Sequence, residues 1–374
     1  MSNDNFDVTY LSVDSIQEGV GSSQITPLVL GLAERGTKVC LISFEKTKPQ
    51  NNLVELMLAA GVHWIPREFG KQGAVAGVKR LDSLRRCTPK SLVLHGRSDI
   101  PTAAAIWSHV EAPVLWDVRS LWSDQRSLIG TTGWNSVTTR GARALENVSA
   151  RYSDAMTTLT AAVVPILQQR HKRIPEIREV IATSVQTKKF LTASMPKGQI
   201  TCLLSGTFNN YYDIKRTKQV LDEIRKTVDL KIIWARASEA PTERLGVGEN
   251  VIVSATHSEM PRFVNESHFG IAICKQDNLN TLAAAVPTKI GEFLASGRPV
   301  IVSKGIGDLD QMLTSTQTGL VIDPSDSLQT VAEQIILLLE DPETPTRCRD
   351  LAMRHFDMEK SVDKYLDIYD RMQR

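Results

Sequence analysis

The chain opens with two strand-like runs, Val8-Thr-Tyr-Leu-Ser-Val13 and Val39-Cys-Leu-Ile-Ser43, and these decide the fold. Both are short and rich in β-branched and apolar residues, which is typical of buried strands. Residues 25–35 between them have helical periodicity, and Gly36 can end that helix in the left-handed conformation. A glycine-containing loop is expected at 19–24, before the helix. Strand, helix and strand in this order form the unit that builds parallel sheets.

The alternation continues in two series, which predicts two domains. The first series carries further strand-like runs at 62–65, 91–95, 114–118 and 155–159, with helical patterns between them. A linker-like stretch at 188–198 precedes a second series that starts at Ile200. A chain of 374 residues also exceeds the size of one ordinary core. We therefore expect two Rossmann-like α/β domains facing each other across a cleft, 1–190 and 191–355, with 356–374 as a helix packing back on the first.

Composition narrows the class of protein. Five scattered cysteines without a C-x-x-C pair argue against a disulfide framework and a zinc site, and favour a reducing cytoplasm. No apolar stretch approaches the roughly 18 residues that a membrane span needs, and no signal peptide is visible. Residues 1–190 carry 23 Lys and Arg against 17 Asp and Glu, whereas the remainder is acidic. This asymmetry suggests different partners for the two halves, or chance variation in surface charge.

Five segments carry a family resemblance. The most specific is Val286-Pro-Thr-Lys-Ile-Gly-Glu-Phe-Leu-Ala-Ser-Gly-Arg-Pro-Val-Ile301, and the second is Trp116-Asp-Val-Arg-Ser-Leu-Trp-Ser-Asp-Gln-Arg126. With His95-Gly-Arg-Ser98, Thr157-Thr-Leu-Thr160 and 206–213, they resemble, in order, the GT4-like branch of the GT-B glycosyltransferases over essentially the whole chain. The resemblance implies transfer of a sugar from a nucleotide-sugar such as a UDP- or GDP-sugar. The acceptor would be a glycan, a lipid-linked molecule or a protein, in bacterial surface glycan biosynthesis.

Lys289 and Glu292 are the strongest donor-site candidates. They are three residues apart and so share one face of a helix. A carboxylate there can accept hydrogen bonds from both ribose hydroxyls, while the lysine reaches a phosphate. An ordinary exposed ion pair is the alternative at this spacing, and the surrounding match favours the ligand role.

The other donor-site candidates are less specific. Gly206 and Thr207 follow a strand and could offer a backbone N–H and a hydroxyl to the diphosphate; a plain turn is the alternative. Many relatives carry an arginine after this glycine and a lysine soon after, and this chain does not. The diphosphate charge must therefore be balanced elsewhere, by Arg236, Lys289 or Arg97, and His257 and Lys275 complete the charged and polar candidates. Gly21 resembles part of the family's glycine loop, which lets the backbone approach the donor phosphate or the acceptor; a simple β–α turn is the alternative.

The sugar contact departs from the family. Two glutamates eight positions apart are frequent there; Glu292 fits the second, but Ala284 stands at the first. The sugar would then be contacted by Lys275, Gln276 or Asp277, and neither the sugar nor the stereochemical outcome follows from the sequence.

On the acceptor side we expect Asp117, with Arg119, to form the catalytic group, and His95 to be its runner-up. A satisfied buried histidine is the alternative for His95. They lie at the ends of apolar strands, where buried charges need partners. Asp117 would act as the acid–base or orienting residue. Alternatively, Asp117 and Arg119 pair with each other or with Arg97 in a structural network. Asp124 and Arg126 are expected in the loop that follows.

A basic amphipathic helix is predicted within Lys71–Lys90, with Val75, Val78, Leu81 and Leu84 as its apolar positions. Such a helix could lie on an anionic membrane surface beside a lipid-linked acceptor; a solvated basic face is the alternative. We expect a cytoplasmic protein, with peripheral contact at the inner face of the membrane as the finer expectation.

Other functions fit less well. A nicotinamide dehydrogenase is disfavoured, because neither first strand is followed by a good match to the G-x-G-x-x-G turn of that class. An epimerase of the same fold stays open as an alternative, although the 116–126 and 286–301 segments fit the GT4-like set better. A non-catalytic partner protein that lost the chemistry also stays open, because of Ala284 and the altered 206–213 loop. No nucleic-acid signature accompanies the basic first half. No metal or other cofactor is expected. The D-x-D sequence Asp308-Leu-Asp310 lies past the predicted donor helix and not at the end of a strand. The resemblance implies that side chains and helix termini balance the phosphate charge.

Overall fold

The computed structural model describes residues 5–71, 73–128, 137–191, 194–206, 211–236, 250–255 and 259–374. Its contacts divide the chain into unit 1, Met1–Ala182 with Met358–Arg374, and unit 2, Thr183–Asp357. The first boundary precedes the predicted linker at 188–198. The reason is that Thr183 Oγ1 donates to the Val286 carbonyl at 2.7 Å, and the Val185 amide donates to the Phe356 carbonyl at 2.7 Å. Residues 183–190 are thereby held in unit 2.

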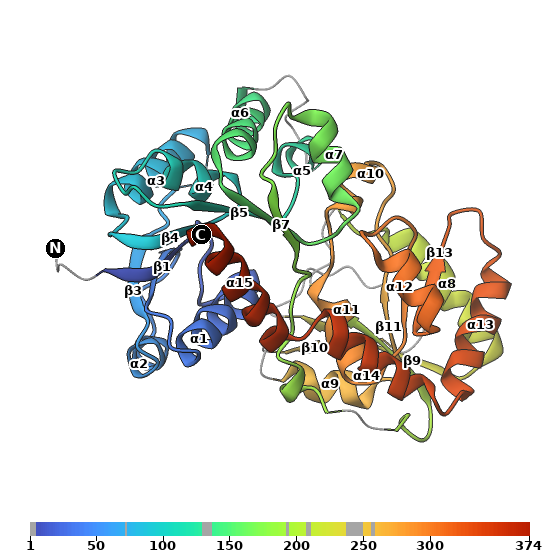
Figure 1. The fold of residues 1–374 in the computed structure, drawn as a ribbon. Helices are drawn as coiled ribbons and strands as arrows, with labels where there is room; N and C mark the ends of the chain where they lie inside the picture. Colours follow the sequence, from blue (N-terminus) through green and yellow to red (C-terminus); the bar gives the residue numbers. More distant parts are fainter. Residues whose placement is uncertain are drawn as a thin grey trace. The chain divides into compact units, whose positions relative to one another are not determined.

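Unit 1 is a seven-stranded sheet with helices on both faces (Figure 1). Its strand order is β3-β2-β1-β4-β5-β6-β7, and all its strand pairs are parallel. The strands are β1 (Phe6–Leu11), β2 (Val39–Glu45), β3 (His63–Glu68), β4 (Ser91–Arg97), β5 (Val114–Val118), β6 (Ala155–Thr158) and β7 (Ile177–Val180). The helices are α1 (Thr26–Glu34), α2 (Asn51–Ala59), α3 (Ala74–Cys87), α4 (Asp99–Ile106), α5 (Trp122–Leu128), α6 (Val137–Tyr152), α7 (Val163–Arg170) and α15 (Met358–Gln373).

The last helix of the chain, α15, completes the core of unit 1. Its buried side chains Val362, Tyr365 and Ile368 pack with α1 against one face of the sheet. Gly31 on α1 permits the close approach, because a Cβ there would lie 2.7 Å from a Val362 methyl group. Arg35 then pairs with Glu359 at 3.0 Å and with Asp363 at 2.8 Å. On the other face, α3 and α4 cover a separate apolar cluster.

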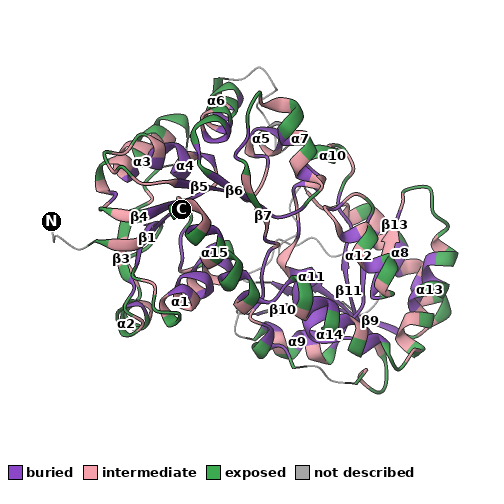
Figure 2. Ribbon diagram, viewed as in Figure 1, coloured by how far each residue is buried: buried purple, intermediate pink, exposed green. Residues whose placement is uncertain are grey.

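Unit 2 is a six-stranded sheet, also parallel in each pair, with the order β10-β9-β8-β11-β12-β13. Its strands are β8 (Ile200–Ser205), β9 (Leu230–Arg236), β10 (Asn250–Ser254), β11 (Phe269–Ala272), β12 (Val300–Ser303) and β13 (Gly319–Ile322). Its helices are α8 (Ile214–Thr227), α9 (Met260–Glu266), α10 (Leu279–Ala283), α11 (Thr288–Ala295), α12 (Leu309–Thr316), α13 (Leu328–Glu340), α14 (Thr344–His355) and the short 3₁₀ turn η2 (Thr187–Lys189). Figure 2 shows the strands buried and the helices exposed on their outer faces.

The predicted α/β class with two parallel-sheet units is confirmed, and the strand order adds what the sequence could not give. In both sheets the order reverses beside the first strand, between β1 and β4 and between β8 and β11. Ligands of doubly wound sheets bind at the carboxyl ends of the strands at such a switch point. Each unit therefore has one topologically favoured ligand edge.

Two local predictions were wrong. The loop expected at 19–24 is helical, because Gly21–Ile25 form a π-helical turn, η1, that continues into α1. Residue Asp124 lies on helix α5, where a loop was expected. Among the described residues, no helix combines the length and the apolar character that a membrane span needs.

Candidate active site

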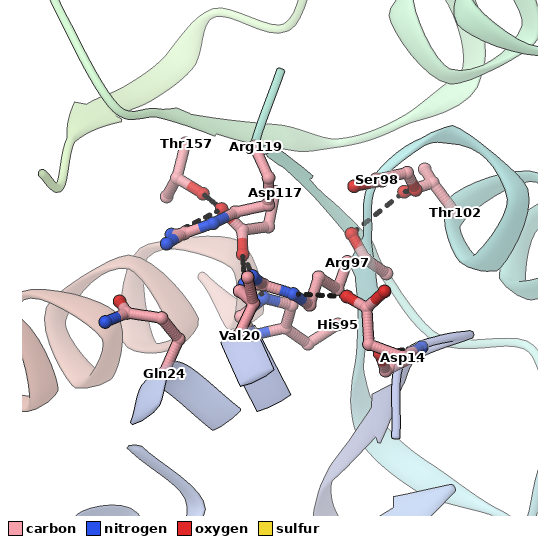
Figure 3. A network of polar contacts seen from close by, with 12 residues as sticks. Asp14, Val20, Gln24, His95, Arg97, Ser98, Thr102, Asp117, Arg119 and Thr157 are labelled. Atoms are coloured by element: carbon pink, nitrogen blue, oxygen red, sulfur yellow. Dashed lines mark hydrogen bonds and ion pairs between the residues drawn. The ribbon is translucent and has the colours of Figure 1, made fainter. Parts of the chain in front are cut away.

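The acceptor-side candidates of unit 1 meet in one polar cluster at its switch point (Figure 3). Asp117 stands at its centre. Its Oδ1 accepts from Thr157 Oγ1 at 3.0 Å and lies 3.5 Å from Arg119 Nη1. Its Oδ2 lies 3.4 Å from His95 Nε2 and 3.8 Å from Arg97 Nη1. Strands β4, β5 and β6 thus bring these side chains together, although 62 residues separate the ends of that set in the sequence.

Charge balance keeps the Asp117 carboxylate ionised. Burial alone would raise the pKa of Asp117, but Arg119, His95 and Arg97 outweigh it and hold that pKa well below its usual range. A carboxylate this weakly basic is poorly matched to proton transfer near neutral pH. Of the two roles expected for Asp117, this lowered pKa favours the orienting one.

Two candidate residues of this cluster are unsuited to direct ligand contact. The His95 imidazole has no exposed surface, and burial lowers its pKa. The Arg97 guanidinium is also buried and is committed to Asp14, whose Oδ2 lies 3.2 Å from Nε, and to Asp117. We correct both predictions: His95 is not placed to touch a substrate, and Arg97 is not placed to neutralise a diphosphate. Arg119 keeps a small exposed fraction of 12%.

Backbone strain marks the same edge of the sheet. Ser98, directly after β4, has φ of +68°, which is costly for a residue other than glycine. Its amide donates to the Asp117 carbonyl at 2.9 Å, and its carbonyl accepts from Thr102 Oγ1 at 2.7 Å. Strain that neighbouring bonds hold in place is characteristic of functional sites.

Asp124 and Gly21 have structural explanations. Asp124 is buried and forms a short ion pair with Arg170 on α7. Gly21 is packed against the Ser15 carbonyl, where a Cβ would lie 1.7 Å from the oxygen. The glycine is therefore required by contact within unit 1, and the expected approach of a ligand is not its reason.

The donor-side pair of unit 2 lies on α11. Lys289 and Glu292 share this helix and are both buried, which excludes the ordinary exposed ion pair. Burial, opposed by Cys274 and Glu292, lowers the pKa of Lys289 to about 8. Burial, opposed by Lys289, raises the pKa of Glu292 to about 7. The Lys289 ammonium also lies 4.3 Å from the ring centroid of Tyr212, a cation–π contact.

The remaining donor candidates surround the switch point of unit 2. Gly206, after β8, adopts φ of +81°, and its amide donates to the Ala235 carbonyl at 2.8 Å. That N–H is thus used within the sheet, and the prediction that it binds the diphosphate is corrected. Arg236 ends β9 and stacks over Trp234 at 4.2 Å. Lys275 follows β11 and its side chain is exposed. Thr207 and His257 lie outside the described residues.

The position of the missing glutamate is buried. Ala284 follows helix α10 and is 3% exposed. Gln276 donates to the Lys304 carbonyl at 3.2 Å, while Asp277 and Lys275 are exposed beside it. The two exposed side chains remain the candidates for a sugar contact.

Sequence reasoning missed the aromatic part of both sites. Tyr369 on α15 contacts His95, and Tyr212 contacts Lys289. The i,i+4 spacing of Tyr365 and Tyr369 on a helix expected to return to the first domain was a usable signal. Tyr212 lies in the quoted 206–213 segment, but nothing in its sequence position points to the lysine.

Comparisons with known proteins agree with this geometry. Residues 188–355 match the model of the glycosyl transferases group 1 family. Sucrose-phosphate synthase from Thermosynechococcus elongatus is similar in structure with a TM-score of 0.71 at 13% identity, covering 98% of each chain. HepE of Anabaena in complex with UDP has a TM-score of 0.66 at 12% identity, covering 98% of this chain and 100% of that one.

A third similar structure is WaaG, a glycosyltransferase involved in lipopolysaccharide biosynthesis. Its TM-score is 0.67 at 13% identity, covering 97% of this chain and 99% of that chain. A search of curated proteins found no match. At these identities the structural likenesses establish the fold over the full chain.

Proposed function

Because residues 188–355 carry the group 1 glycosyl transferase domain on a chain with the GT-B fold, we propose that this glycosyltransferase uses a nucleotide-sugar donor. HepE is similar in fold and was solved with UDP, which supports a uridine nucleotide as the first donor to test. The acceptor would be a glycan, a lipid-linked molecule or a protein, and bacterial surface glycan biosynthesis is the setting that the resemblance favours. We expect no metal requirement.

The observation that carries this proposal is the buried Lys289/Glu292 pair at the ligand edge of unit 2. Buried ionisable groups whose pKa values are shifted toward neutrality are characteristic of functional sites. A nucleotide-sugar offers a ligand group to each: phosphate oxygens to the ammonium and ribose hydroxyls to the carboxylate. Lys289 would then stabilise the negative charge that develops on the leaving diphosphate.

Unit 1 would present the acceptor. We infer that Asp117, ionised and held by four neighbours, orients the acceptor rather than exchanging a proton with it. Arg119 is the most exposed of the four neighbours of Asp117, at 12%, so it is placed to contact that acceptor directly.

A thermal-shift screen tests donor binding. Wild-type protein is heated with UDP-, GDP-, ADP- and CMP-sugars, and we expect one nucleotide class to raise the unfolding temperature. A ligand at about 100 times its Kd stabilises by about 2.7 kcal/mol. Stabilisation by none of the four would contradict the proposed donor site and favour a protein that lost the chemistry.

The pH dependence of donor affinity follows from the two pKa values. Ribose contact needs ionised Glu292, whose pKa of about 7 makes affinity rise with pH up to about that value. Phosphate contact needs protonated Lys289, whose pKa of about 8 makes affinity fall above it. We expect tightest binding between these values, measured by calorimetric titration of a nucleotide-sugar from pH 6 to pH 9. Glu292→Gln should remove the acidic limb alone; an unchanged profile in this variant would contradict the assignment.

Peripheral membrane contact is the finer proposal, and helix α3 supports it. The structure corrects the predicted apolar face: Leu84 is buried, but Val75 and Val78 in the first turns are 73% and 67% exposed. Lys71 and Lys79 flank them and are exposed. Because α3 follows β3, these turns lie toward the same sheet edge as the Asp117 cluster. Exposed apolar residues flanked by lysines suit an anionic membrane surface that presents a lipid-linked acceptor.

Vesicle co-sedimentation tests that contact. We expect wild type to bind vesicles containing anionic phosphatidylglycerol, and Val75→Ser/Val78→Ser to bind on the order of tenfold less, since a buried valine is worth about 1.5 kcal/mol and insertion is partial. Leu58→Ser on α2 is the matched control, because Leu58 is 78% exposed on a helix that contains no lysine or arginine. Equal binding of the valine variant and the control would contradict a role for α3.

A further inference from the structure

Three tyrosines enclose the His95 imidazole in unit 1, and two of them come from α15. The ring centroids of Tyr10, Tyr365 and Tyr369 lie 4.2, 5.2 and 5.9 Å from that of His95. None of these four side chains is more than 2% exposed. The imidazole is therefore closed to any substrate and can act only through the groups that it touches.

The partners of His95 fix its tautomer. Its Nδ1 lies 2.6 Å from the Tyr369 hydroxyl, and its Nε2 faces Asp117 Oδ2 at 3.4 Å. The second distance is too long for a hydrogen bond, and neither atom makes one in the described structure, so this contact is electrostatic. An ionised carboxylate has no proton to donate to the ring. A lone pair on Nε2 would be repelled there, so Nε2 carries the proton. Because the buried ring is neutral, Nδ1 is then the acceptor and Tyr369 O–H the donor.

We propose that Tyr369 is a positioning residue for Asp117, acting through His95. The Tyr369 hydroxyl holds the imidazole in the Nε2–H tautomer, and the Nε2–H then directs one carboxylate oxygen of Asp117. The other oxygen is held independently by Thr157 and Arg119. The inference rests on the proposed function in one respect, that Asp117 orients the acceptor; the chain of contacts itself does not depend on it.

The proposal makes the last helix part of the active-site support. Helix α15 is fixed at its beginning by Arg35 and along its length by Lys364, which pairs with Glu179 at 3.2 Å. The helix thereby places the Tyr369 hydroxyl beside His95 on strand β4, and through His95 it influences the orientation of Asp117 on strand β5. A shift of α15 by one turn would move the Tyr369 hydroxyl away from the imidazole.

The chain supplies its own control. Tyr365 lies one turn before Tyr369, is equally buried and also packs on His95, but its hydroxyl makes no hydrogen bond in the described structure. Tyr369→Phe and Tyr365→Phe therefore remove the same atom from the same helix, and only the first removes a bond to the imidazole. Both variants keep the aromatic packing, so both should fold.

The test combines spectroscopy with turnover. Wild type and both variants are labelled with ¹⁵N-histidine, and the His95 ring signals are assigned by their loss in His95→Gln. Donor turnover is measured in parallel, with a mixture of membrane lipids present as acceptor. We expect wild type and Tyr365→Phe to show the Nε2–H tautomer and equal turnover. Tyr369→Phe should shift the Nδ1 signal and lower kcat by about tenfold, because misplaced groups cost rate, with KM for the donor unchanged.

The outcomes separate cleanly. The same His95 signals in Tyr369→Phe and Tyr365→Phe would overturn the tautomer assignment. A shifted Nδ1 signal with unchanged kcat would overturn the positioning role. If wild type turns over no donor, the proposed function fails, while the ring signals still decide whether Tyr369 sets the tautomer of His95.

Discussion

Replacing Asp117 by asparagine should destabilise unit 1 by about 3–5 kcal/mol, the cost of breaking a buried charge pair by removing one partner. The substitution keeps the shape of the side chain and its neighbour Thr157. It removes the negative charge that balances the buried guanidinium of Arg97 and that of Arg119. Urea denaturation followed by a fluorescence probe in unit 1 measures the loss.

Asp14→Asn is the matched control for this prediction. Asp14 pairs with the same Arg97 at 3.2 Å, but its side chain is 48% exposed, so the change should cost at most about 1 kcal/mol.

The destabilisation caused by Asp117→Asn should also depend on pH in a definite direction. The folded pKa of Asp117 lies below the unfolded one, so its stabilisation is complete above the unfolded pKa of about 3.9. Below that pH the gap between wild type and Asp117→Asn should close. Equal stability of the two proteins at pH 7 would show that the charge is not needed.

Replacing Lys289 by methionine should have the largest effect on activity. We expect donor affinity to fall about 10- to 100-fold, from the loss of a charge-assisted hydrogen bond worth about 1.5–3 kcal/mol. Turnover should fall by about 100-fold or more, since the charge of the leaving diphosphate grows in the transition state. Calorimetric titration and a nucleotide-release assay measure the two effects.

Stability distinguishes this loss from unfolding. Because burial lowers the pKa of Lys289 to about 8, the charged form is disfavoured in the fold, and removing it at pH 7 should leave stability equal or higher. Glu292 can take up a proton when its neighbour is gone, since its own pKa is about 7. Lys226→Met, at an exposed lysine paired with Glu223 at the end of α8, should leave affinity and turnover unchanged. A comparable loss in both variants would point to a general charge effect.

The two-domain α/β fold was predictable because each strand run and each helix period is local in sequence. Gly36 illustrates this: it ends α1 with φ of +84°, as its position predicted. Strand order was not predictable, since parallel pairing joins segments far apart. The switch points, and with them the meeting of Asp14 with Arg97, follow only from that order.

The charged residues of the site were predictable from the sequence, but the contacts that surround them were not. The Lys289/Glu292 spacing identified the helix face, and strand-end charges identified Asp117 and Arg119. Their environment depends on groups that no local pattern relates, such as Tyr212 under Lys289 and Tyr369 against His95. Glycine positions were the weakest guide. Gly21 is required by the Ser15 carbonyl and Gly206 by its left-handed turn, so neither needed a ligand to explain it.

The most direct test of glycosyl transfer from a nucleotide-sugar is donor cleavage. Wild type and Lys289→Met are incubated with UDP-, GDP-, ADP- and CMP-sugars, without and with a mixture of membrane lipids as acceptor, and released nucleotide is quantified. We expect wild type to release nucleotide slowly from one donor class, faster when an acceptor is present, and Lys289→Met to release about 100-fold less. Release from no donor by folded wild-type protein, or equal release by Lys289→Met, would contradict the assignment of this site.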